Sequence, residues 1–490
     1  MSSASRAPAV TVVGGGLAGS EAAWALAQRG VPVVLREMRP VVRTAAHQTD
    51  QLAELVCSNS FKSTDPTNAH GLLKAELRAL GSLLLAVADE ARVPAGAALA
   101  VDRAVFSHRV HEQLTAHPLI AVARGEVTEV PSPGIVATGP LTSPALANAI
   151  ITRIGRGGSG VLAAAGQAPP TPAAASAPSP VRTATSLQGA VAVSSPPTAA
   201  LAFYDAIAPI VSHESLDHSR LYALSRYGKG DGDDYLNAPM NREEYETFIA
   251  ALTAADQFTA HEFDQVPYFE GCLTVEVMAR RGPQTLRFGP MKPVGLPDPR
   301  TGREPWAVVQ LRREDKAGQM WNLVGFQTRL RIPEQKRVFG TIPGLEGAEF
   351  LRYGSIHRNS YINSPAFLGP GLTARDDDTL FFAGQLTGVE GYTESLGTGL
   401  LAGINLARRL AGKPVTVPPP TTMLGALYRY LREAEPTRFQ PMNANWGLVA
   451  PLGGPADGRT GGRRGKDAKK QLLLGRAQAE FAEWLRSVSE

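Results

Sequence analysis

The apolar residues near the start of the chain predict a strand, a turn, a helix and a second strand. Residues 10–13 are a β-branched run typical of a buried strand, and three glycines follow at once. Residues 20–29 are rich in alanine and predict a helix, which Gly30 ends. Residues 31–35 predict the next strand. This order is that of the first unit of a dinucleotide-binding α/β fold.

The same pattern indicates the later elements. It predicts strands at residues 134–138, 307–311, 323–326 and 380–383 and helices at residues 242–255 and 395–410. Residues 157–200 differ, because alanine, proline, serine and glycine dominate and Arg182 is the one charge between residues 161 and 200. A segment with so little large apolar surface cannot offset its ordering entropy, so we expect a disordered insertion.

These changes in composition divide the chain. We expect a dinucleotide-binding domain in two parts, residues 1–150 and 336–413, with an α+β domain at residues 201–335 between them. A proline-rich linker at residues 414–420 leads to a helical C-terminal region at residues 421–490.

Composition narrows the class of protein. The chain has 490 residues, which suits two or three domains, and 43% of them are hydrophobic. No apolar run reaches the roughly 20 residues of a membrane-spanning helix. The apolar run at residues 9–13 enters a glycine turn and does not have the form of a signal peptide. We therefore expect a cytoplasmic protein that binds no membrane.

The net charge of +4 permits an anionic partner. Between residues 459 and 476 only Asp467 accompanies seven basic residues, which are Arg459, Arg463, Arg464, Lys466, Lys469, Lys470 and Arg476. Two interpretations of this tail stay open: a solvated helix face, or contacts with a phosphate backbone.

The glycine turn satisfies the pattern GxGxxG with Gly14, Gly15, Gly16, Leu17, Ala18 and Gly19. Gly14 would permit the tight turn, Gly16 would let the backbone approach a pyrophosphate, and Gly19 would let helix and strand pack closely. Glu37 follows eighteen residues after the last glycine. Its carboxylate suits ribose hydroxyls and repels a 2′-phosphate, which disfavours NADP at this site.

Two later features favour FAD over NAD. A turn through Gly139 after a strand is frequent in flavoproteins of this fold, and so is a late strand that enters a glycine loop, here at Gly384 and Gln385. The helix after that loop would point its positive end at the flavin. The expected fold class is therefore α/β: an FAD-binding Rossmann-like domain of the glutathione-reductase type, with an inserted α+β domain and a helical C-terminal region.

The chain has two cysteines, Cys57 and Cys272. In a cytosolic enzyme such thiols are either inert core residues or reactive groups. Five stretches bear on that choice: residues 55–63 (LVCSNSFKS), 268–272 (YFEGC), 281–293 (RGPQTLRFGPMKP), 384–395 (GQLTGVEGYTES) and 440–445 (QPMNAN). Through them the chain resembles the folate- and FAD-dependent tRNA (uracil-5-)-methyltransferases, over nearly its whole length except the insertion and the tail. The flavoproteins that modify the wobble uridine of tRNA share the fold but not the two cysteine segments as a pair.

The resemblance implies methylation of C5 of the uridine at position 54 in the T-loop of tRNA. The carbon would come from 5,10-methylenetetrahydrofolate and the electrons from reduced FAD, which NAD(P)H regenerates. FAD would contact the glycine turn, Glu37 and Gly139, and also Gly384, Gln385, Gly391, Tyr392 and Ser395.

The same resemblance gives roles to the thiols. A thiolate that adds to C6 of uracil makes C5 nucleophilic, and a base must then remove the C5 proton. By resemblance Cys272 is the nucleophile and Cys57 is the general base beside the flavin; the reverse assignment stays open. Lys62, Arg280 or Arg281 would supply the positive field that a reactive thiol needs.

The chain departs from the family pattern at two places. Ala238 stands where the family usually has cysteine, which argues against an essential third thiol. Leu396, Gly397 and Thr398 follow Ser395 where small alanines are usual, and this change would shift the start of that helix near the flavin.

A T-loop uridine must leave its stack to react, so the protein would hold the T-arm by its loop shape and phosphates. Besides the basic tail, candidate phosphate contacts are Lys229, Arg280, Arg281, Arg287 and Lys292. Tyr392 or Trp446 would stack on folate or base, or pack in the core. Two alternative functions stay open: the same chemistry on ribosomal RNA, and flavin-dependent RNA binding without methyl transfer. A dithiol reductase would require the fold to pair two cysteines that lie far apart in sequence.

Overall fold

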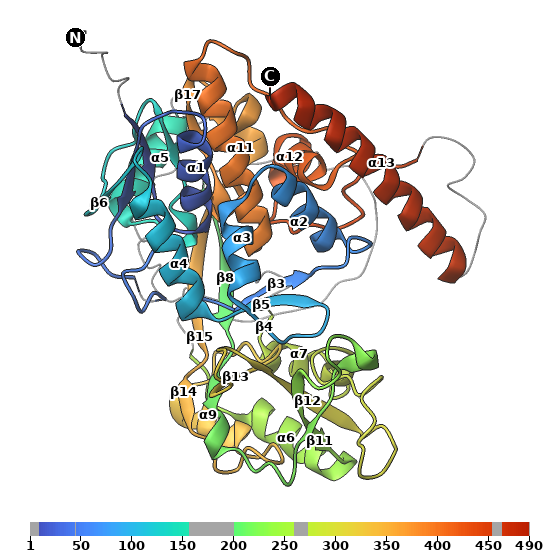
Figure 1. Ribbon diagram of the computed structural model, residues 1–490. Helices are drawn as coiled ribbons and strands as arrows, with labels where there is room; N and C mark the ends of the chain where they lie inside the picture. The colour runs from blue at the N-terminus through green and yellow to red at the C-terminus, as the bar shows by residue number, and fades with distance from the viewer. Residues whose placement is uncertain (1–8, 45, 156–199, 259–272, 453–462, 490) are drawn as a thin grey trace, which may run out of the picture.

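The computed structural model describes residues 9–44, 46–155, 200–258, 273–452 and 463–489 (Figure 1). Cys272 and the predicted disordered insertion, up to residue 199, lie outside these residues. In Figure 1 the elements from both ends of the chain form one body, and the middle of the chain forms a second, smaller body below it.

The larger body is built on a six-stranded sheet that unites early and late parts of the chain. Its strands, in spatial order, are β16 (Thr373–Ala374), β17 (Asp377–Phe382), β7 (Gly134–Val136), β1 (Val10–Val13), β2 (Val33–Glu37) and β6 (Ile120–Arg124). All neighbours pair in parallel except β16 and β17. The predicted strands are therefore confirmed in type, although β2 begins and ends two residues later than predicted.

Two helices pack against each other on this sheet, α1 (Leu17–Ala27) and α11 (Tyr392–Leu410). They approach closely because α11 carries glycines at the contact. A Cβ on Gly399 would lie 2.2 Å from the carbonyl oxygen of Ala18, and a Cβ on Gly403 would lie 2.7 Å from that of Ala22. Neither position has room for a side chain.

Both helices begin three residues earlier than the sequence predicted, since the glycine before each helix is its N-cap. Gly16 precedes α1, and Gly391, with φ 121°, precedes α11. Ser395 therefore lies within the first turn of α11 and is not its first residue.

Buried carboxylates cap the N-termini of two further helices. Glu21 accepts hydrogen bonds from the backbone N–H groups of Leu83 and Leu84 at the start of α3 (Leu83–Glu90). In the same way Glu76, in α2 (Ala69–Ala79), accepts those of Met423 and Leu424 at the start of α12 (Met423–Glu433). Each carboxylate satisfies N–H groups that have no partner within their own helix.

The second body is an antiparallel sheet covered by short helices. Its strands, in order, are β10 (Tyr222–Ala223), β11 (Tyr235–Met240), β12 (Ala307–Arg313), β13 (Met320–Leu323), β9 (Ile210–Ser212) and β14 (Phe350–Arg352). The helices include α6 (Arg242–Ala254), α7 (Val275–Arg280), α8 (Thr285–Phe288) and α9 (Ile332–Phe339). The predicted strand at 323–326 is wrong by three residues, because the chain leaves the sheet after Leu323 and turns at Gly325, whose φ is 77°.

Two small sheets lie between the bodies. One is the ladder of β8 (Ala200–Ile207) and β15 (Ser355–Ile362), and the other consists of β3 (Ser60–Ser63), β5 (Ala98–Val101) and β4 (Arg92–Val93). After β5 the chain enters α4 (Arg103–Ala116). The candidate site lies beside these two sheets.

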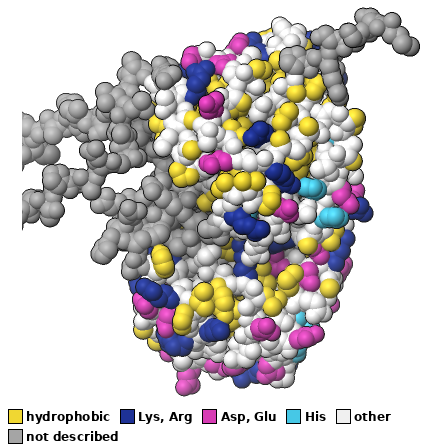
Figure 2. Space-filling model, turned by 90° about the vertical axis from the view of Figure 1, so that its left-hand side faces the viewer, with side chains coloured by type: hydrophobic (Ala, Val, Ile, Leu, Met, Phe, Trp, Pro, Cys, Tyr) yellow, Lys and Arg dark blue, Asp and Glu magenta, His cyan; other side chains and the backbone are white. Residues whose placement is uncertain are grey.

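The C-terminal helix α13 (Arg463–Ser489) packs on the larger body, where the indole N–H of Trp484 donates to the hydroxyl of Thr416 at 2.9 Å. Arg476, one of the basic tail residues, donates to the carbonyl groups of Ala450 and Pro451, so it stabilises the fold. No helix among the described residues is long and apolar enough to cross a membrane. Figure 2 shows cationic, anionic and apolar side chains interspersed on the face at the left of Figure 1.

Candidate active site

A cavity lies beside the glycine turn at the start of α1. Most of the predicted cofactor residues line it, and these are Gly14, Gly16, Leu17, Ala18, Glu37, Gly139, Gly384, Gln385, Tyr392 and Ser395. Gly15, Gly19 and Gly391 do not line it. The structure thus brings together residues from three distant parts of the chain, while their contacts with a ligand stay a prediction.

The glycines of the turn differ in what a side chain would meet. A Cβ on Gly14, where φ is 104°, would lie 2.5 Å from the carbonyl oxygen of Ala137, and a Cβ on Gly19 would lie 1.8 Å from that of Gly14. A Cβ on Gly16 would meet no atom within 4 Å. Gly14 and Gly19 are therefore required by packing, whereas Gly16 leaves open space at the positive end of α1.

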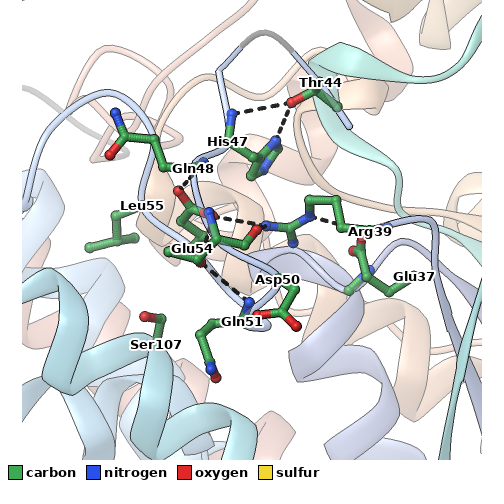
Figure 3. Close-up of polar contacts among 12 residues, drawn as sticks. Glu37, Arg39, Thr44, His47, Gln48, Asp50, Gln51, Glu54, Leu55 and Ser107 are labelled. Carbon is green, nitrogen blue, oxygen red and sulfur yellow. Dashed lines mark hydrogen bonds and ion pairs between the residues drawn. The ribbon is translucent and has the colours of Figure 1, made fainter. Parts of the chain in front are cut away.

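Glu37 is held in its ionised form at the end of β2 (Figure 3). It accepts hydrogen bonds from the backbone N–H of Gly15 and from the backbone and side chain of Arg39, each at 2.9 Å. Burial alone would raise the pKa of Glu37, but the hydrogen bonds and charge of Arg39 outweigh it and hold the pKa below its usual value. Arg39 in turn donates to Glu54 at 2.9 Å, which fixes the loop beside the cavity.

The start of α11 closes the other side of this cavity. Glu394, in its first turn, is 1% exposed and accepts the backbone N–H of Ala444 at 2.8 Å. It also forms an ion pair with His70 at 3.2 Å. Burial alone would raise the pKa of Glu394, but the hydrogen bond from His70 and the charges of Lys62 and His70 hold it below its usual value.

A second cavity adjoins the first and lies between the two bodies. Its lining includes Cys57, Lys62, Arg312 and Asn443. Five residues line both cavities: Val56, Pro140, Leu141, Gln385 and Tyr392. A group bound in the second cavity would therefore lie against a ligand bound in the first.

Cys57 lies in a loop that three distant side chains hold in place. The Tyr392 hydroxyl accepts hydrogen bonds from the backbone N–H groups of Cys57 and Ser58, both at 3.0 Å. Arg103 donates to the Cys57 carbonyl at 3.3 Å and forms an ion pair with Glu314 at 2.6 Å. The loop is thus fixed with two guanidinium groups near it, since the buried Arg312 also donates to the Ser58 hydroxyl at 2.9 Å.

Sequence reasoning missed Arg103 and Arg312, which stand close to Cys57. The predicted Arg280 and Arg281, at the C-terminal end of α7, do not line either cavity, and their effect on Cys272 stays a prediction because Cys272 lies outside the described residues. No local pattern marks Arg103 or Arg312, because both reach Cys57 only through the tertiary fold. Lys62 is the predicted cation that the structure does place in the cavity with Cys57.

Two predicted ligand contacts are engaged elsewhere. Arg287 lies 3.6 Å from the ring centroid of Trp306 and donates to the Trp306 carbonyl at 2.7 Å, so it contributes to packing. Trp446 donates to the Thr67 carbonyl at 3.0 Å and packs against the core of the larger body. Stacking of Trp446 on folate or base is therefore not supported, and core packing is confirmed.

Ala238, where the family usually has cysteine, is fully buried on β11. It belongs to the core of the second body and does not line either cavity. Among the described residues no group of His, Cys, Asp and Glu could hold a metal ion. The site is therefore organised around two cavities and a cysteine.

The parallel sheet, the glycine turn and the adjoining cavities define a dinucleotide-binding α/β protein of the glutathione-reductase type, with a second cavity beside the first. Among solved structures, Aquifex aeolicus GidA in its form II crystal has a TM-score of 0.61 at 15% identity and covers 97% of this chain and 74% of its own. That likeness supports the fold.

Sequence comparisons define the family. The family described as Glucose inhibited division protein A matches residues 9–414. The TrmFO methylenetetrahydrofolate–tRNA-(uracil-5-)-methyltransferase of Geobacter sulfurreducens is 52% identical over 98% of this chain and 99% of its own length. The protein of the same name from Thermus thermophilus is 51% identical over 98% of this chain and 97% of its own. The chain therefore belongs to the Glucose inhibited division protein A family and, within it, to the TrmFO methyltransferases.

Proposed function

We propose that this protein methylates C5 of the T-loop uridine at position 54 of tRNA, with the carbon of 5,10-methylenetetrahydrofolate and electrons from FAD reduced by NAD(P)H. One observation carries the proposal: the loop of Cys57 lies where the two cavities meet, and Tyr392 lines both of them. The names of the curated relatives support the folate and the tRNA.

The residues of the first cavity fit FAD. Gly16 leaves space for a pyrophosphate at the positive end of α1, and the ionised Glu37 can accept ribose hydroxyls. The start of α11, through Tyr392 and Ser395, would face the flavin. When bound there, reduced FAD supplies the hydride that converts the transferred methylene group into a methyl group.

The chain's own residues would carry the uracil chemistry. The Cys272 sulfur would add to C6, and C5 would then attack the methylene carbon of the folate. Cys57 would take the C5 proton as the bond between the methylene carbon and the folate nitrogen breaks, so that tetrahydrofolate leaves and a methylene group stays on C5. Hydride addition to that methylene group, with cleavage of the C6–S bond, would complete the reaction. Cys272 lies outside the described residues, so its role rests on the resemblance. For Cys57, the positive charges of Arg103 and Arg312 would stabilise a thiolate.

Covalent trapping on a T-arm RNA that carries 5-fluorouridine tests these roles, because fluorine at C5 cannot leave as a proton. We expect Cys272→Ala to abolish the adduct and Cys57→Ala to keep the adduct without turnover. An adduct that persists in Cys272→Ala would reverse the assignment. Parallel methylation assays on tRNA and ribosomal RNA decide between the two RNA targets.

A further inference from the structure

Lys62 has a backbone conformation that lysine rarely adopts. Its φ is 65°, in the left-handed region where glycine is favoured. The pairing of β3 with β5 is irregular at the same place, between Ser60 and Ser63. A non-glycine residue at such a φ persists only where its surroundings impose it and is frequent at ligand sites.

Buried side chains impose this conformation. The ammonium of Lys74 is fully buried and donates to the carbonyl of Phe61, the residue before Lys62, at 2.6 Å. Thr393 donates to the same carbonyl at 3.5 Å, and the Lys62 N–H donates to the hydroxyl of Ser60 at 3.0 Å. Burial lowers the pKa of Lys74 to about 7, so this contact is costly to maintain in the charged form.

The side chain held in this way enters the second cavity. Lys62 lines it together with Cys57 and Ser60. Within the described part of the chain no carboxylate forms an ion pair with the Lys62 ammonium. The charge of Lys62 acts on the buried carboxylate of Glu394 from beyond ion-pair distance, so the ammonium can still contact a ligand.

Two more lysines lie near Asp65, which follows Lys62 by three residues. The N–H of Thr64 donates to Ala97 at 2.8 Å, and the Cβ of Lys229 lies 3.9 Å from where a Cβ on the adjacent Gly96 would stand. The charge of Lys470, on α13, also acts on Asp65. Hydrogen bonds from Thr67, followed by the charges of Lys229 and Lys470, lower the pKa of Asp65 despite its partial burial.

We call Lys62, Lys229 and Lys470 the lysine strip. The strip draws on three separate parts of the chain. The acidic residues near it are Asp65, which Thr67 holds, Glu394, whose pKa the charge of Lys62 lowers, and Asp234, which accepts the Gly96 N–H at 2.6 Å. One lysine in the cavity and two exposed lysines near Asp65 match a phosphodiester backbone better than they match one carboxylate.

We propose that Lys62 binds the backbone phosphate next to the target nucleotide at the cavity mouth, and that Lys229 and Lys470 bind phosphates further along the same strand. This inference rests on the proposed function, since it requires RNA as the substrate. Lys62 would then bind the RNA backbone in the same cavity that Cys57 lines.

The test is binding of a T-arm RNA hairpin to the flavin-loaded full chain, measured by fluorescence anisotropy over a series of salt concentrations. We expect Lys62→Met to raise Kd roughly tenfold and to reduce the salt slope by about one, with Lys62→Arg near wild type. Lys62→Gly should weaken binding equally without lowering the thermal midpoint, because glycine tolerates the left-handed backbone. Lys336→Met, which removes an exposed lysine of α9, is the matched control.

The outcomes separate the two proposals. An unchanged Kd and salt slope in Lys62→Met, with wild type binding the hairpin, would overturn the role of Lys62 alone. A raised KM for the folate with unchanged RNA binding would also overturn it and would assign the cation to the folate carboxylates. A wild-type chain that binds no RNA would overturn the proposed function and this inference together.

Discussion

The hydroxyl of Tyr392 accepts two hydrogen bonds, from the N–H groups of Cys57 and Ser58, across 335 and 334 positions of the sequence. Tyr392 is also the first residue of α11 and lines both cavities. Through this one side chain the position of the Cys57 loop depends on the helix that closes the dinucleotide cavity.

Tyr392→Phe should therefore impair turnover more than cofactor binding. The change leaves two backbone N–H groups without their acceptor, which costs about 1–3 kcal/mol each where they are buried. Because the loop of Cys57 then loses its position, we expect kcat for methylation to fall roughly 10- to 100-fold, while the flavin absorbance of the purified protein stays near that of wild type.

Tyr428→Phe provides the matched control. The Tyr428 hydroxyl likewise accepts a backbone N–H, that of Gly371 at 2.8 Å, but it lines neither cavity. This variant should lose stability without a comparable loss of kcat. If both variants lowered kcat to the same extent, Tyr392 would have a purely structural role.

Alanine substitutions at two glycines of the turn should have different effects, one on folding and the other on flavin binding. Gly19→Ala places a Cβ 1.8 Å from the carbonyl oxygen of Gly14, so the protein should fold poorly or not at all. Gly16→Ala meets no protein atom within 4 Å, so the chain should fold with a near-normal circular dichroism spectrum. Its flavin affinity should fall about tenfold or more, because the methyl group occupies space meant for the pyrophosphate. Normal flavin content in purified Gly16→Ala would argue against this position of the cofactor.

The buried Lys74 gives a pH-dependent contribution to stability. Burial lowers its pKa to about 7 in the folded protein from 10.5. Between these values the unfolded chain binds more protons, so the free energy of unfolding rises with pH, by up to about 1.4 kcal/mol per pH unit. Below pH 7 this contribution is constant.

Urea unfolding of wild type and Lys74→Met measures that contribution. The difference in free energy of unfolding between the two should change in favour of wild type from pH 7 upward and level off toward pH 10.5. Lys336→Met, at an exposed site, should show no such change. Curves for Lys74→Met and wild type that stay parallel throughout would show that Lys74 keeps its ordinary pKa.

The contrast between the glycine turn and the Cys57 loop shows what the sequence could predict. Gly14, Gly16 and Gly19 act through backbone conformation and close packing, which a short pattern encodes, so their places were foreseen. The helix starts at Leu17 and Tyr392 were missed by three residues, because a glycine N-cap leaves no side-chain signal.

The surroundings of Cys57 were beyond sequence reasoning. Arg103 reaches it across 46 positions, and Arg312 reaches the next residue across 254. Such contacts exist only once the small sheet, the second body and α11 are assembled. Lys62 was named as a cation near the thiols, but its left-handed backbone and its support by Lys74 required coordinates.

Transfer of a carbon atom from folate to uracil in this protein can be followed directly with a labelled carbon. The direct measurement supplies 5,10-methylenetetrahydrofolate labelled with ¹⁴C at the methylene group, NAD(P)H and unmodified tRNA to the flavin-loaded chain. We expect label at C5 of the T-loop uridine in wild type and none in Cys57→Ala. Label that stays in the folate with wild type, or that enters ribosomal RNA and not tRNA, would contradict the proposed function.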